Sequence, residues 1–63
     1  MCEATAYLLK DDNEELLLES VDLVEPEGDG SIKLVSIFGE QKVVQARIKK
    51  MALVDHKIFL EPA

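Results

Sequence analysis

Apolar and polar residues alternate with a period of two along most of this chain, and this pattern constrains the fold more than any other feature. Within residues 42–49, Val44, Ala46 and Ile48 share one parity while the other parity is mostly polar. Residues 3–9 (EATAYLL) alternate in the same way. Successive side chains of a strand point to opposite faces, so this periodicity predicts strands with one face toward a core.

Turn signals divide the chain into several short strands. The strongest breaker is residues 25–30 (EPEGDG), which hold one proline and two glycines. Asp12-Asn13 tolerates the left-handed backbone of a tight hairpin, and Gly39-Glu40 indicates a second tight turn. We therefore predict strands over residues 3–9, 14–24, 31–38, 42–49 and 56–61, with 51–54 forming a turn or continuing the fourth strand.

Residues 13–24 are the ambiguous part of this assignment. The apolar residues change parity along the segment, which predicts a bulge or bend near Glu19-Ser20. A helix is the alternative, because Asn13 would cap it and Leu17 and Val21 fit helical spacing. The strands on both sides favour the extended form. We expect an all-β fold, a small five- to six-stranded barrel of SH3-like or OB-like kind, as one domain over residues 1–63.

A chain of 63 residues with a single cysteine must be stable without an internal disulfide. A core of this size supplies roughly 3–5 kcal/mol, so tight packing or self-association is expected. The lone cysteine fits a reducing compartment. No stretch approaches the ~18 apolar residues of a membrane span, and the start lacks the basic region of a signal peptide. We expect a cytoplasmic protein without a membrane partner.

The charge is divided unevenly along the chain. Residues 1–30 hold ten acids and one base, whereas residues 31–63 hold three acids and six bases, which together give the net charge of −6. An acidic domain is a poor general ligand for nucleic acid, because phosphate binding is driven by the release of cations on contact with Lys and Arg. A local patch remains as the alternative function, an RNA-binding module that uses Arg47, Lys49, Lys50 and Lys57. A third hypothesis is a protein-docking barrel whose acidic half is the contact face.

Cys2 is the residue with the most distinctive chemistry. If Met1 is retained, its α-amine, the Met1–Cys2 amide nitrogen and the Cys2 thiolate can close two fused five-membered chelate rings; if it is removed, the new amine and the thiolate close one. Nitrogen–thiolate sets suit Ni(II), copper and Zn(II). Glu3 and His56 are possible secondary ligands, although each also fits an ordinary exposed position. The sequence has no CxxC, HExxH, GxSxG or GxGxxG motif, so we do not expect an enzyme.

The opening MCEATAYLL, the central ELLLESVDLVEPEGDG and the later IFGEQKVVQARIKKMALVDHKIFLE resemble the CooT family over nearly the whole chain. These are small nickel-binding accessory proteins associated with carbon monoxide dehydrogenase maturation. The resemblance implies Cys2 as the nickel ligand, a homodimer that brings two Cys2 groups together, and a nickel-enzyme client. The chain is more distantly similar to HypC-like hydrogenase maturation chaperones, which also begin with Met-Cys. Their proline a few residues after the cysteine is absent from positions 3–6 here.

Overall fold

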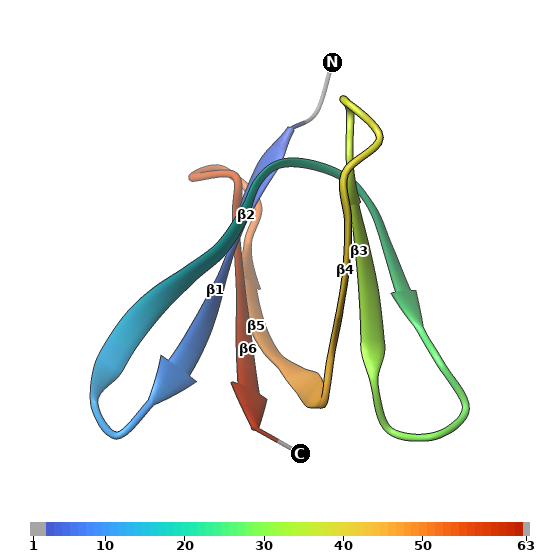
Figure 1. The fold of residues 1–63 in the computed structure, drawn as a ribbon. Coiled ribbons are helices and arrows are strands. Elements are labelled where there is room, and N and C mark those ends of the chain that lie inside the picture. The colour runs from blue at the N-terminus through green and yellow to red at the C-terminus, as the bar shows by residue number, and fades with distance from the viewer. Residues whose placement is uncertain (1–2, 63) are drawn as a thin grey trace.

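The computed structural model describes residues 3–62, and six strands in this range form one sheet (Figure 1). The strands are β1 (Ala4–Lys10), β2 (Asn13–Pro26), β3 (Ile32–Ser36), β4 (Gln41–Val44), β5 (Ala46–Ala52) and β6 (Lys57–Pro62). Their order across the sheet is β4-β3-β2-β1-β6-β5. The all-β prediction is confirmed, and the helical alternative for residues 13–24 is wrong. Over residues 3–62, no helix has the length and apolar character needed to cross a membrane.

The sheet is strongly curved because its two edge strands are consecutive in the chain. β4 and β5 lie at opposite ends of the strand order, yet only Gln45 separates them. The segment predicted as one strand over 42–49 is therefore two strands. The chain leaves β4 at one edge of the sheet and enters β5 at the other edge. The two edges converge at this corner and diverge toward the other end (Figure 1). The result is a barrel-like sheet that is not closed.

The predicted bend in the second strand is present at Ser20. This residue has a φ of 56°, and the register of β2 against β3 shifts between Val21 and Leu23. The main-chain N–H of Ile37 donates to the main-chain oxygen of Ser20 over 2.9 Å. The bend lets β2 pair with β1 through its first part and with β3 through its last part. One long strand thereby serves both halves of the curved sheet.

The hairpin between β1 and β2 turns one residue earlier than expected. Asp11 and Asp12 have φ values of 51° and 69°, and Lys10 pairs with Asn13. Two-residue hairpin loops of this kind need a positive φ at both central positions, a conformation that aspartate tolerates. Asn13 is consequently the first residue of β2 and not part of the turn.

The third strand ends at Ser36, two residues before the predicted end. The buried Ser36 hydroxyl accepts hydrogen bonds from the main-chain N–H groups of Phe38 and Glu40, both over 3.1 Å. Gly39 has a φ of 87°, which suits glycine, and closes the turn. This turn carries Phe38 outward, where 76% of it is exposed.

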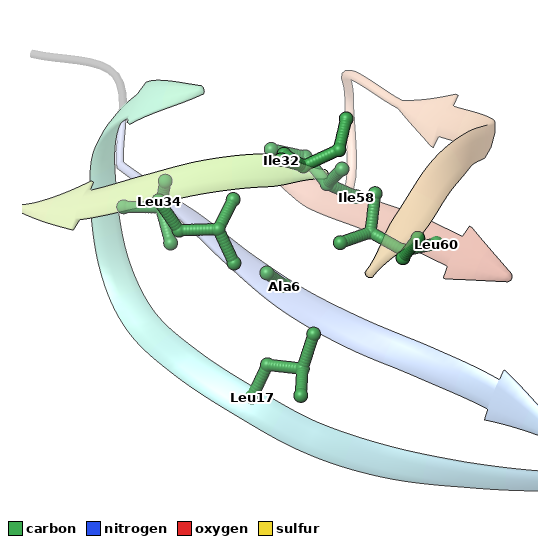
Figure 2. Packing of buried hydrophobic residues seen from close by; sticks show 8 residues of the cluster. Ala6, Leu17, Ile32, Leu34, Ile58 and Leu60 are labelled. Carbon is green, nitrogen blue, oxygen red and sulfur yellow. The ribbon is translucent and has the colours of Figure 1, made fainter. Parts of the chain in front are cut away.

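The core lies on the concave face of the sheet, where buried side chains from five strands point toward one another (Figure 2). Leu34 and Leu60 are the largest side chains that are fully buried. Ala6 of the first strand and Ile58 of the last are both buried on this face. The cluster consists of Ala6, Leu17, Val21, Ile32, Leu34, Ala46, Ile58 and Leu60.

Candidate functional site at the start of the first strand

The two predicted metal ligands, Met1 and Cys2, lie outside the described residues, so the structure informs on the chain that follows them. β1 begins at Ala4 and runs parallel to β6, with Thr5 opposite Lys57. The main-chain N–H of Thr5 donates to the main-chain oxygen of His56 over 2.9 Å. The start of β1 is thus held against the turn between β5 and β6, at one end of the curved sheet (Figure 1).

A pocket of about 330 Å³ opens at this end of the sheet. Buried Val21 and Ile58 lie among its lining residues, whereas Met51 and Leu53 are 52% and 74% exposed. Four ionisable side chains also line it, and two of them are the predicted secondary ligands. The complete lining is Glu3, Ala4, Val21, Asp22, Val24, Met51, Leu53, His56, Lys57 and Ile58.

Glu3 and His56 therefore line one pocket although 53 positions separate them in the sequence (56 − 3). A carboxylate and an imidazole are ligands that borderline divalent metals accept. No group of three or more His, Cys, Asp or Glu within residues 3–62 is arranged to hold a metal ion. The structure thus places the two predicted secondary ligands in the lining of the same pocket.

His56 also has a clear conformational role in the turn between β5 and β6. Its φ is 57°, and its main-chain N–H donates to the main-chain oxygen of Leu53 over 3.2 Å. Histidine is among the residues enriched at positive φ. Any substitution that tests the imidazole must therefore preserve this backbone conformation.

The four cations of the predicted nucleic-acid patch are held in different surroundings. Arg47 Nε lies 2.9 Å from Glu61 Oε2, so its charge is paired. Lys49 lines a second pocket that also contains Asp11 and Asp12. This part of the surface mixes both signs of charge, which weakens its attraction for phosphate.

The other two lysines lie over aromatic rings on the outer face of the sheet. Tyr7 and Phe59 are stacked with ring centroids 5.6 Å apart and an interplanar angle of 20°. Lys50 Nζ is 4.9 Å from the centroid of Phe59, and Lys57 Nζ is 5.9 Å from that of Tyr7. Cation–π contacts of this kind occupy ring faces that a base would otherwise stack on. RNA binding by Arg47, Lys49, Lys50 and Lys57 stays a prediction.

Sequence reasoning did not assign Met51, Leu53 and Asp22 to a site. Met51-Ala52 extends β5, and residues 53–56 form the turn that follows. The signal in the sequence was the apolar run at 51–54, which is unusual beside a turn. Leu53 and Val54 are 74% and 92% exposed, so this run forms an apolar surface next to the pocket.

Comparisons with known proteins match this chain to a family and to a solved structure. The sequence model of the CooT family, described as the CO dehydrogenase accessory protein CooT, matches residues 1–61. An uncharacterised protein of Methanocaldococcus jannaschii is 39% identical over 61 residues, which is 97% of this chain and 98% of that protein. A crystal structure of a chain provisionally described as CooT, from Carboxydothermus hydrogenoformans, is 48% identical. It superposes with a TM-score of 0.90 and covers 98% of both chains.

Proposed function

The chain belongs to the CooT family of CO dehydrogenase accessory proteins, and on this premise we propose that it captures Ni(II) through Cys2 and delivers the ion to a nickel enzyme. The observation that carries the proposal is the family match over residues 1–61, because this range includes the terminal cysteine. The client is carbon monoxide dehydrogenase or one of its maturation factors. The chain itself acts as a carrier and not as a catalyst.

Cys2 supplies a sulfur ligand that Ni(II) accepts together with nitrogen donors. A thiolate with one or two main-chain nitrogens leaves a planar four-coordinate site incomplete, and d⁸ Ni(II) accepts planar nitrogen–sulfur fields. Glu3 and His56 line the neighbouring pocket and are available as weaker donors. An incomplete ligand set favours release, since a client can supply the remaining ligands during transfer.

A homodimer would complete the site in another way. With a two-fold axis near the N-termini, two chains would contribute one Cys2 thiolate each. The exposed apolar side chains of Leu53 and Val54 lie at this end of the sheet and support such a contact. Capture requires a reduced thiol, so we place the process in the cytoplasm.

The proposal is tested by titrating the full chain and Cys2→Ser with Ni(II) while following thiolate-to-nickel charge-transfer absorption. We expect saturable binding by the parent chain and loss of the band in the variant. Binding weakens as the pH falls, because the thiolate and amine must lose protons to bind the metal. Mass spectrometry of the same sample establishes whether Met1 is present. Equal nickel affinity in the two proteins would overturn the proposal.

A further inference from the structure

β5 is an edge strand, and its open side is the long edge that does not pair with β6. It pairs with β6 along its length, and it is the last strand in the order of the described sheet. Ala46 is buried, but residues 47–51 are exposed. An edge strand presents unpaired main-chain N–H and C=O groups, which can pair with a strand from another chain.

Two pockets lie along the open side of β5. The pocket described above contains Met51, and another of about 360 Å³ contains Ile48. On the side opposite β5, the pocket that contains Met51 is lined by residues of β2. The pocket that contains Ile48 is lined there by the loop before β3 and by the start of β3. The lining of this other pocket is Pro26, Glu27, Gly30, Ser31, Ile32, Ala46, Arg47 and Ile48. The open side of the sheet therefore has an apolar recess toward each end of β5.

Ile48 and Met51 both face the concave side of the sheet although three positions separate them. Their partners in β6 are the buried residues Leu60 and Ile58. A register shift between Ile48 and Lys50 absorbs the extra residue, as a β-bulge does. Ile48 is 37% exposed and Met51 is 52% exposed, so both are incompletely covered. Apolar side chains two positions apart on an added strand, roughly 6.6 Å from each other, match this spacing.

The charges on β5 indicate the chemistry of the occupant. Arg47, Lys49 and Lys50 are exposed on this strand, and Arg47 alone forms an ion pair within the described residues. Two copies of β5 placed side by side would bring lysines together, which opposes pairing. Asp11 and Asp12 line a pocket with Lys49, but they belong to the hairpin between β1 and β2 and not to β5. A strand that carries carboxylates is complementary to the cations of β5 itself.

We propose that β5 accepts an extended acidic strand from another protein, with alternate apolar side chains in the two pockets and carboxylates beside Lys49 and Lys50. The added strand would pair with the main chain of β5 and extend the open edge of the sheet. This mode of recognition takes affinity from main-chain hydrogen bonds and specificity from alternate side chains. Binding of this strand does not require nickel, and the experiment below contains no metal.

The test uses two fluorescein-labelled peptides that alternate valine with glutamate or valine with lysine, followed by anisotropy. We expect the glutamate peptide to bind the full chain at least about tenfold more tightly than the lysine peptide. The preference should decrease as salt is added. Hydrogen exchange should show new protection within residues 46–52 when the glutamate peptide is bound.

Substitutions at two positions whose side chains are about equally exposed test where the peptide contacts the protein. Met51→Asp should weaken binding at least about tenfold, because a carboxylate replaces an apolar contact and repels the peptide. Leu16 is 50% exposed on β2, and Leu16→Asp should leave binding unchanged. Equal binding of both peptides, equal effects of both variants, or protection outside β5 would overturn the proposal. Protection of β5 that rises with protein concentration alone would assign this edge to a second copy and also overturn it.

Discussion

The main-chain N–H of Thr5 donates to the main-chain oxygen of His56 over 2.9 Å. This bond holds the start of β1 against the turn between β5 and β6. Thr5 is three positions after Cys2. The bond belongs to a parallel pairing that continues through Thr5 and Lys57. Glu3 and His56 consequently line the same pocket, and the predicted secondary ligands can be tested as a pair.

Replacing Glu3 or His56 should weaken nickel binding less than replacing Cys2. We expect Glu3→Gln and His56→Asn to reduce affinity by about tenfold or less, because each removes an accessory donor and leaves the thiolate. Asparagine is chosen at position 56 because it tolerates the positive φ of this residue. Isothermal titration with Ni(II) measures the effect, and Glu14→Gln in the opposite hairpin is the control. A larger loss in His56→Asn than in Cys2→Ser would contradict this ranking.

The bend of β2 should make Ser20 sensitive to β-branched residues. Ser20→Val should lower the free energy of unfolding by about 1–3 kcal/mol, because its side chain is strained at a φ of 56°. Ser20→Gly should change it by less than about 1 kcal/mol, since relief of strain offsets the added flexibility of the unfolded chain. Urea unfolding measures both. Glu19→Val at the preceding exposed position is the control. An equal loss of stability in Glu19→Val would contradict the explanation that the positive φ of Ser20 causes the effect.

Leu34 is fully buried in β3, and its truncation tests the small core directly. Leu34→Ala should cost about 2–5 kcal/mol through lost burial and the cavity that remains. A core of this size provides roughly 3–5 kcal/mol, so the variant should retain at most about 3 kcal/mol and unfold at a clearly lower temperature than the parent chain. Circular dichroism during thermal unfolding checks this result. Leu16→Ala, at a half-exposed position, should unfold close to the parent temperature; similar losses in both variants would contradict the assigned core.

The loop between β2 and β3 contains a carboxylate that should respond to pH. Asp29 Oδ1 accepts hydrogen bonds from the Ser31 hydroxyl over 2.6 Å and from its main-chain N–H over 3.1 Å. The side-chain bond, followed by the main-chain bond, lowers the pKa of Asp29 from its ordinary value of 3.8. The unfolded chain therefore binds a proton at a higher pH than the folded chain. The stability from this loop is present above about pH 4 and is lost as the pH falls through the lowered pKa.

Ser31→Ala removes the hydroxyl donor and should raise the pKa of Asp29 toward its ordinary value. Carbon-detected NMR titration of the side-chain carboxyl measures the shift. The carboxyl of Glu27, which lies in the same loop, serves as the internal reference in these spectra. An unchanged Asp29 titration in Ser31→Ala would contradict the hydrogen-bond explanation.

The strand pattern was largely predictable from sequence because alternation and turn residues are local signals. The parity change before Val21 correctly indicated the bend at Ser20. The split at Gln45 was not predictable, because residues 42–49 alternate without a breaker and only tertiary pairing separates β4 from β5. The end of β3 was missed because Ser36 caps the turn through its side chain, which an apolar pattern through Phe38 does not reveal.

The candidate site was only partly predictable for a similar reason. Glu3 and His56 could be listed as donors from their chemistry, but their common pocket results from the parallel pairing of β1 with β6. The residues that flank Glu3 and His56 in the sequence do not indicate that β1 pairs with β6. The contact between Arg47 and Glu61 likewise depends on the β5–β6 register, which places them opposite each other. The number of cations in a patch can be counted from the sequence, but the carboxylates that pair with them, such as Glu61 with Arg47, are known only from the fold.

Nickel delivery is the central claim, and transfer to a nickel-free CO dehydrogenase tests it most directly. The enzyme is incubated with nickel-loaded parent chain or with Cys2→Ser exposed to the same nickel, in the presence of a chelator that removes free Ni(II). We predict recovery of CO oxidation with the parent chain and little recovery with the variant, because Cys2 holds the transferred ion. Equal recovery with both chains, or none with the nickel-loaded parent, would contradict the account.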